Sequence, residues 1–216
     1  MAGLDLTRLR VPRIRRLMPG SGERRAFFQE FLRHPEQVGS VVPSSRFLEA
    51  RVVRTAGVAD AKLVVELGPG TGGITRAVLN ALPRDSKLLA VEINEEFARL
   101  VRREPDPRLI VHCGSAVDLP EILAQHGLAS PDVILSGIPF STMPAEIGSR
   151  ILAAVWEALA PGGRFVAYQL RARVAELGRE VLGRPEVGYE FLNVPPMRVY
   201  CWRKPLNGHP AAPAAD

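Results

Sequence analysis

The chain has 216 residues and a formal net charge of +5, with 46% hydrophobic and 24% charged residues. This length fits one domain with a short accessory segment, and the hydrophobic content suffices for a buried core. No apolar run reaches the roughly 18 to 20 residues that span a bilayer, and arginines interrupt the apolar clusters of the N-terminus, which argues against a signal peptide. The two cysteines lie far apart and read as buried thiols, and no cysteine and histidine cluster has metal-ligand spacing, so we expect no metal.

Residues 1–58 are predicted to form a basic, amphipathic helical arm or lid. Residues 1–25 carry seven arginines, one aspartate and one glutamate, which accounts for the whole net charge. Three phenylalanines, Phe27, Phe28 and Phe31, fall on one face of a helix that ends before Pro35, and Ser44 or Ser45 can cap the next helix, roughly 45–57. A basic arm with an aromatic stripe suits an anionic membrane surface, although it would also suit a nucleic acid, and a purely structural lid is the alternative.

Residues 59–204 alternate apolar strands with helices. Strands are predicted at 62–66, 87–92, 109–112, 132–136, 164–170, 189–194 and 197–203, and helices at about 73–82, 95–103, 118–125, 144–160 and 172–182. Continuous apolar strands separated by helices indicate a parallel sheet covered on both faces. The last two strands are too close in sequence for a helical crossover, so that pair should be antiparallel. Residues 205–216, rich in alanine and proline, are expected to be a disordered tail.

A strand, a glycine-rich turn and a helix meet at residues 64–73, VVELGPGTGG. The glycines allow positive φ angles and close approach of a ligand, and the helix start offers free N–H groups. Glu66, at the end of the strand, could face a cationic amino acid group. Glu92 ends the next strand, where a carboxylate can hold ribose hydroxyls. The G-x-G-x-G spacing also differs from the dinucleotide fingerprint, so the pattern favours S-adenosylmethionine.

These motifs resemble those of class I S-adenosylmethionine-dependent methyltransferases. The resemblance covers roughly residues 60–204 and implies a Rossmann-like α/β sheet and S-adenosylhomocysteine as the product. Gly114 to Ala116 stands where many members carry Gly-Asp-Ala beside adenine; Ser115 departs from that pattern. The candidate cofactor residues are Glu66, Gly68, Pro69, Gly70, Thr71, Gly72, Glu92, Ile93, Ser115, Ala116 and Ser136.

The acceptor of the methyl group should lie where the fourth and fifth strands end, because ligands of parallel sheets bind at the carboxyl ends of strands. The candidates there are Gly137, Ile138, Pro139, Phe140 and Tyr168. Enzymes that methylate base amino groups open this turn with Asn or Asp, which grips the amine; Gly137 cannot. We interpret this as adaptation to an aliphatic amine, with Phe140 and Tyr168 as cation–π faces. The alternative is that both rings pack in the core.

The stretch 31–45, FLRHPEQVGSVVPSS, together with SGIPF at 136–140 and NVPP at 193–196, resembles bacterial phospholipid N-methyltransferases. This resemblance implies a cytoplasmic enzyme, peripherally bound to the inner face of the membrane, that methylates phosphatidylethanolamine toward phosphatidylcholine. No nucleic acid partner is expected. Arg46, Arg171 and Arg173 are candidates for the lipid phosphate, and Phe27, Phe28 and Phe31 for the membrane.

Two other functions stay open, an RNA adenine methyltransferase and a methyltransferase of a small soluble amine. Any general base could be Tyr168, His34 or water. The pattern does not determine the number of methyl groups added or the oligomeric state.

Overall fold

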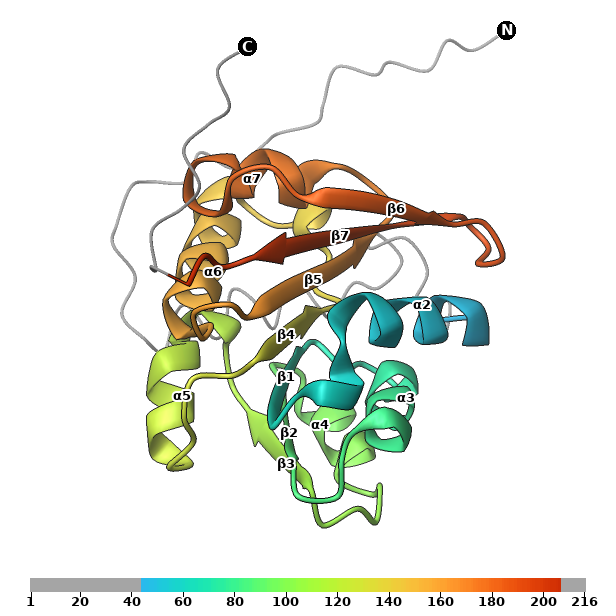
Figure 1. Ribbon diagram of the computed structural model, residues 1–216, viewed down its shortest axis with the longest axis vertical. Helices are drawn as coiled ribbons and strands as arrows, with labels where there is room; N and C mark the ends of the chain where they lie inside the picture. The colour runs from blue at the N-terminus through green and yellow to red at the C-terminus, as the bar shows by residue number, and fades with distance from the viewer. Residues whose placement is uncertain (1–43, 207–216) are drawn as a thin grey trace, which may run out of the picture.

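The computed structural model describes residues 44–206 (Figure 1). Most of the predicted N-terminal arm, including Phe27, Phe28, Phe31 and His34, therefore lies outside the described residues, as does most of the predicted tail. The described part of the chain forms one sheet with helices on both faces, as the alternating strands and helices predicted.

Seven strands form the sheet in the order β3-β2-β1-β4-β5-β7-β6. Strands β1 to β5 pair in parallel, whereas β7 is antiparallel to both β5 and β6. The predicted mostly parallel α/β sheet with an antiparallel end is therefore confirmed. The strands are β1 (Leu63–Leu67), β2 (Lys87–Glu92), β3 (Leu109–Cys113), β4 (Val133–Ser136), β5 (Arg164–Gln169), β6 (Glu186–Glu190) and β7 (Met197–Arg203).

The helices cover both faces of the sheet because successive strand residues alternate between two apolar clusters. Val64 packs with helices α2 and α3, whereas Val65 packs with α5, α6 and α7 on the other face. Short 3-10 turns occupy 58–60, 116–118 and 140–142. The helices are α2 (Arg46–Ala56), α3 (Gly73–Ala81), α4 (Glu95–Val101), α5 (Leu119–Gln125), α6 (Ala145–Ala158) and α7 (Arg173–Leu182).

Helix α2 packs tightly on the sheet. Ser45 caps it, accepting a hydrogen bond from Leu48 N at 3.3 Å, which confirms the predicted cap. Leu48, Val52 and Ala56 point into the core and are at most 1% exposed. Gly57 ends the helix in the left-handed conformation, with φ 69°. The helix therefore joins the folded body through its apolar face.

The predicted antiparallel partner of the last strand is present, but its predicted bounds, 189–194, are wrong. Strand β6 spans Glu186–Glu190, and Glu190 opposite Met197 is the last pair of the ladder, so 191–196 forms the loop of a β6–β7 hairpin. The apolar side chains of this loop suggested a strand, but Pro195 and Pro196 have no N–H to donate to a ladder. The side chains of Phe191, Leu192 and Val194 are instead 71%, 62% and 80% exposed.

Candidate active site

The loops after β1 to β5 all lie at one edge of the sheet, the carboxyl edge, because these strands are parallel. The chain leaves β1 toward β2 on one side and continues with β4 and β5 on the other, so the loops after β1 and β4 flank the point where the strand order reverses, which is where such sheets bind ligands. The two loops approach closely: a Cβ atom at Gly68 would lie 3.2 Å from Ile138 Cγ1. The predicted cofactor and acceptor residues meet at this edge.

The glycine-rich turn has the conformation that its sequence predicts. Gly68, Gly70 and Gly72 have φ angles of 71°, 56° and 80°, which side chains other than glycine rarely adopt. Pro69 and Thr71 lie between them. Gly72 precedes α3 at the capping position and has no side chain, so the first N–H groups of α3 have no side-chain cap. The N–H groups of Gly68, Gly70 and Gly72 are bonded to Val91 O, Glu92 Oε2 and Pro69 O, so the free backbone donors of this segment include those at the start of α3.

Glu66 is completely buried at the end of β1. Its Oε2 accepts a hydrogen bond from Thr75 Oγ1 at 2.7 Å, whereas no donor among the described residues reaches Oε1. Burial raises the pKa of Glu66 to about 7, and the hydrogen bond from Thr75 only partly opposes this rise. A buried carboxylate oxygen without a donor fits a cationic ligand group, such as the amino group of S-adenosylmethionine.

Glu92 links the loops after β1 and β2. Its Oε2 accepts a hydrogen bond from Gly70 N at 3.1 Å, and its Oε1 accepts one from Asn94 N at 2.9 Å. Burial raises its pKa, and the backbone bonds from Asn94, Gly70 and Ile93 oppose that rise. Each oxygen keeps a second lone pair, so Glu92 can still accept bonds from two hydroxyls of a ligand.

The remaining predicted cofactor residues also lie at the carboxyl edge. Ser115 follows β3 and accepts a hydrogen bond from Val117 N at 3.3 Å, which leaves its hydroxyl hydrogen able to donate. Ala116 is buried beside it. Ile93 follows β2 and is half-buried, and Ser136 ends β4, where its Oγ accepts a hydrogen bond from Ile138 N at 3.3 Å.

The turn after β4 is fixed by its neighbours on both sides. Gly137 N donates to Leu67 O of β1 at 3.0 Å, and Gln169 Nε2 of β5 donates to Ile138 O at 2.8 Å. Both bonds use backbone groups of the turn, so the turn is held whatever its side chains are. Pro139 is half-buried at its outer side.

Tyr168 explains why residue 137 is a glycine. Ser136 pairs with Ala167, so Gly137, just past the end of β4, lies beside Tyr168 near the end of β5. A Cβ atom at position 137 would collide with the Tyr168 hydroxyl and would come within 3.0 Å of the Gly68 carbonyl oxygen. The phenol therefore takes the space into which a side chain at 137 would extend. Burial, together with Glu66, Glu92 and Glu49, raises the Tyr168 pKa well above 10, so the group stays protonated.

Phe140 is not placed as predicted. Its ring is 0% exposed and belongs to the apolar cluster under α6 and α7, next to Gly148. Phe140 begins the 3-10 turn at 140–142, and its ring packs into the core. The structure thus offers no ligand-facing surface on Phe140, and the core alternative holds for this ring.

Glu49, which no sequence motif singles out, brings a third carboxylate to the site. A Cβ atom at Gly73 would lie 2.8 Å from Glu49 Oε1, so this side chain of α2 reaches over the start of α3. Burial raises the Glu49 pKa, and Arg76 lowers it. A glutamate in the first turn of a helix is also common as a partner of the helix dipole, so no local pattern distinguishes it.

The three arginines proposed for a phosphate have different surroundings. Arg173 pairs with Glu176 within α7 at 3.1 Å. The Arg46 guanidinium lies 4.8 Å from the ring centre of Phe47. Arg171 is exposed just after β5, at the carboxyl edge. The structure shows no interaction that joins these three arginines into one phosphate site.

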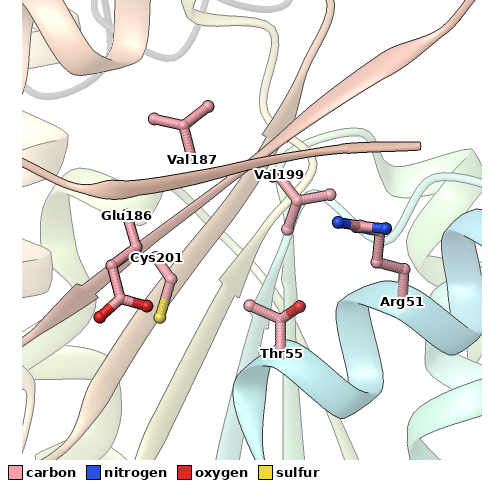
Figure 2. A pocket seen from close by; sticks show the side chains of 7 residues that line it. Arg51, Thr55, Glu186, Val187, Val199 and Cys201 are labelled. Carbon is pink, nitrogen blue, oxygen red and sulfur yellow. The ribbon is translucent and has the colours of Figure 1, made fainter. Parts of the chain in front are cut away.

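A groove of about 220 Å³ lies elsewhere, between α2 and the hairpin (Figure 2). Figure 2 shows Arg51 and Thr55 of α2 across from Val199 and Cys201 of β7, while Val187 points away from α2. None of the predicted cofactor residues lines this groove. Within residues 44–206, no group of three or more side chains is suited to a metal ion, and no helix is long and apolar enough to cross a membrane.

Known proteins match the chain over the same elements. The family described as "Methyltransferase domain" matches residues 64–163. An ornithine lipid N-methyltransferase of Singulisphaera acidiphila is 35% identical over 141 residues, covering 64% of this chain and 73% of that protein. A ribosomal RNA small subunit methyltransferase A of Rhodococcus erythropolis is 27% identical over 194 residues, covering 84% of this chain and 61% of that protein. The chain thus spans less than two thirds of that rRNA methyltransferase.

Solved structures share the fold. The 1,6-didemethyltoxoflavin-N1-methyltransferase of Burkholderia thailandensis, bound to S-adenosylhomocysteine, superposes with a TM-score of 0.62 at 19% identity, covering 89% of this chain and 93% of that one. An O-methyltransferase of Bacillus cereus, also with S-adenosylhomocysteine, gives a TM-score of 0.61 at 13% identity, covering 87% and 93%. These structures share the fold, and the match to the methyltransferase family together with the glycine-rich turn and the unbonded oxygen of Glu66 identifies S-adenosylmethionine as the cofactor. The chain belongs to the class I S-adenosylmethionine-dependent methyltransferases.

Proposed function

We propose that this enzyme N-methylates the amine headgroup of a membrane lipid, phosphatidylethanolamine and its monomethyl and dimethyl forms, toward phosphatidylcholine. The similarity to an ornithine lipid N-methyltransferase supports a lipid amine as acceptor and makes ornithine lipid the second acceptor to test. The N-terminal arginines and phenylalanines support contact with an anionic lipid surface at the inner face of the membrane.

The observation that carries this proposal is the close approach of the Tyr168 hydroxyl to Gly137. In methyltransferases of base amino groups, Asn or Asp at this position accepts the N–H groups of a planar amine. Here the Tyr168 hydroxyl takes the place of that side chain. A neutral phenol offers one acceptor oxygen and one aromatic face, which suits a small aliphatic amine better than a flat base edge.

The remaining site residues are proposed to bind and orient the cofactor. Glu66 would pair with its amino group, Glu92 with its ribose hydroxyls, and Ser115 and Ala116 would border its adenine. The uncapped start of α3 would donate backbone N–H groups to its carboxylate. When bound, S-adenosylmethionine supplies an activated methyl group on a sulfonium sulfur, so positioning provides most of the acceleration.

The acceptor nitrogen must be neutral to attack, and we propose that Tyr168 orients it. Its raised pKa keeps the phenol protonated, which makes it a poor base and a good hydrogen-bond partner for an N–H group. The attacking nitrogen loses its proton to water or to a carboxylate at the edge of the site. Glu49 is the candidate, because its Oε1 lies beside the start of α3 and burial raises its pKa.

The experiment that tests this function measures transfer from labelled S-adenosylmethionine to a panel of acceptors. Vesicles would contain phosphatidylethanolamine, its monomethyl form, its dimethyl form or ornithine lipid, and unmodified ribosomal RNA would serve as the competing class. We expect label in a lipid amine. Transfer to RNA alone would favour the adenine methyltransferase that the rRNA relatives suggest, and transfer only to a soluble amine would favour the third candidate.

A further inference from the structure

The β6–β7 hairpin ends in an exposed apolar tip. Phe191, Leu192 and Val194 are 71%, 62% and 80% exposed, and all three belong to the 191–196 loop. The Phe191 ring stacks on Tyr189 with centroids 6.0 Å apart, which extends the apolar surface along β6. Figure 1 shows the hairpin reaching beyond the rest of the sheet, next to the start of α2. A projecting cluster of large apolar side chains indicates a binding surface.

Several polar groups of this tip are bonded within the protein. Asn193 is 5% exposed; its Oδ1 accepts a hydrogen bond from Ser45 N at 2.9 Å, and its Nδ2 donates to Pro195 O at 2.8 Å. Leu192 N donates to Glu190 Oε1 at 2.9 Å, and Pro195 and Pro196 have no N–H. An apolar medium penalises unbonded polar groups, so this arrangement lowers the cost of placing the tip in lipid.

The charges around the tip favour an anionic surface. Arg46 lies one residue from Ser45, which is bonded to the tip, and Arg198 stands 5.9 Å from the Tyr189 ring centre. Glu190, the acidic residue nearest the loop, is turned toward Arg51 at 3.8 Å and has a side chain only 12% exposed. The tip is therefore apolar at its end and cationic at its base, as in segments that lie at the boundary of headgroups and acyl chains.

The tip also borders the candidate active site. Because β7 runs antiparallel to β5, Arg198 at the start of β7 pairs with Gln169 at the end of β5. The hairpin loop thus lies at the carboxyl edge of the sheet, with Tyr168 and the turn after β4. A surface that met this edge would meet the acceptor side of the site.

We propose that the 191–196 loop inserts into the boundary of headgroups and acyl chains of an anionic membrane and directs the carboxyl edge of the sheet toward the lipid. Insertion is a property of the loop alone, whereas its purpose rests on the proposed lipid methylation. The two are therefore tested with different measurements.

The first test places a fluorescent probe at the tip of the full chain. Phe191→Trp would be mixed with vesicles of phosphatidylcholine and phosphatidylglycerol whose acyl chains carry bromine, a quencher of tryptophan. We expect the added emission to be quenched severalfold more than in Leu100→Trp, a matched control at an exposed apolar position of α4. Equal quenching at both positions would overturn the proposal.

The second test removes the apolar side chains. The variant Phe191→Ser, Leu192→Ser, Val194→Ser should bind these vesicles roughly tenfold or more weakly. The control Leu100→Ser, Leu206→Ser alters exposed apolar residues outside the hairpin and should bind as the unaltered chain does. Unchanged vesicle binding by the tip variant would contradict insertion, whether or not the variant lost thermal stability. A dimer of the unaltered chain that dissociates only in the tip variant would also contradict it, because the tip would then bind a second copy of the chain.

The outcomes for insertion and for function are separable because these vesicles contain no primary amine lipid. Tip-dependent binding without methylation of any amine lipid would leave insertion standing and refute the proposed function. If the tip variant kept both full methylation of amine-lipid vesicles and unchanged vesicle binding, the function would stand and insertion would be refuted.

Discussion

The two carboxylate oxygens of Glu66 have different surroundings, since one is bonded to Thr75 and the other meets no donor among the described residues. Burial raises the Glu66 pKa from 4.5 to about 7, so the folded protein binds a proton here more tightly than the unfolded chain does. The stability from this group is complete below the unfolded value and is lost as the pH rises through the folded value. The cofactor-free protein therefore carries a cost at neutral and alkaline pH that a bound cation relieves.

Substituting Glu66→Gln should separate stability from cofactor binding. The cofactor-free variant should be more stable than the unaltered chain at about pH 8, by up to roughly 3 kcal/mol, and nearly equal to it below about pH 5. Affinity for S-adenosylhomocysteine should fall about 10- to 100-fold, because a charged hydrogen bond is lost. Urea unfolding at both pH values and calorimetric titration measure the two effects.

Two results would contradict this account of Glu66. One is a variant that is less stable than the unaltered chain at alkaline pH. The other is unchanged affinity for S-adenosylhomocysteine, since the amide cannot pair with a cation as a carboxylate does. Thr75→Val serves as a control, because it removes the donor to Oε2 and leaves the carboxylate in place.

Gly137 and Tyr168 should depend on each other. Gly137→Ala places a Cβ against the Tyr168 hydroxyl, so we expect kcat to fall on the order of 10- to 100-fold with a smaller change in cofactor affinity. Tyr168→Phe should lower kcat about tenfold by itself. Because the phenylalanine removes the atom that collides, the double variant should lose less activity than the product of the two single losses.

Steady-state kinetics on amine-lipid vesicles, with calorimetric titration of S-adenosylhomocysteine, would measure this coupling. Strictly multiplicative losses would show that the two residues act independently and would remove the basis for the proposed role of Tyr168. Gly137→Asn, the residue of base methyltransferases, should behave like Gly137→Ala or worse. A gain of RNA methylation in that variant would indicate a base-binding site instead.

At the scale of elements, the sequence predicts most strands within one or two residues because apolar runs, glycine turns and prolines are local signals. The strand from 132 to 136 and the helix from 144 to 160 appear as Val133–Ser136 and Ala145–Ala158. The position of β6 was wrong because the ladder with β7, rather than local hydrophobicity, decides where it ends. Phe140 was misplaced because the direction of a ring in a turn depends on the helices packed around it.

The proximity of Gly137 and Tyr168 follows from register. The order of the sequence suggests that both residues end neighbouring strands, and the pairing of Ser136 with Ala167 bears this out. That the phenol fills the space beside Gly137 requires side-chain coordinates. Glu49 could not be predicted for the same reason, since it belongs to α2 and reaches the site only through the packing of α2 against the start of α3.

The cap of α2 has a predictable energetic role. Ser45→Ala removes the acceptor for Leu48 N and should lower the free energy of unfolding by about 1 kcal/mol. Ser45→Asp, which can still accept that bond, should retain most of the stability. Urea unfolding measures both, and equal losses in the two variants would contradict the capping role. The backbone bond from Ser45 N to Asn193 remains possible in each.

At the scale of the whole molecule, the carboxyl edge brings together the cofactor residues, the acceptor turn and the hairpin tip, while the N-terminal segment carries the excess positive charge. Deleting residues 1–34 should therefore weaken binding to anionic vesicles more than binding to S-adenosylhomocysteine, because each basic residue near such a surface contributes about 1 kcal/mol. Vesicle flotation and calorimetric titration compare the two. Equal losses would support a purely structural lid.

The central claim is that the acceptor is a lipid amine rather than an RNA base. The most direct measurement gives the full chain labelled S-adenosylmethionine together with phosphatidylethanolamine vesicles and unmodified ribosomal RNA in one reaction, and then separates lipid from RNA. We expect label in the lipid fraction, bound to the headgroup nitrogen, and none in the RNA. Label in the RNA alone, or in neither fraction, would contradict it.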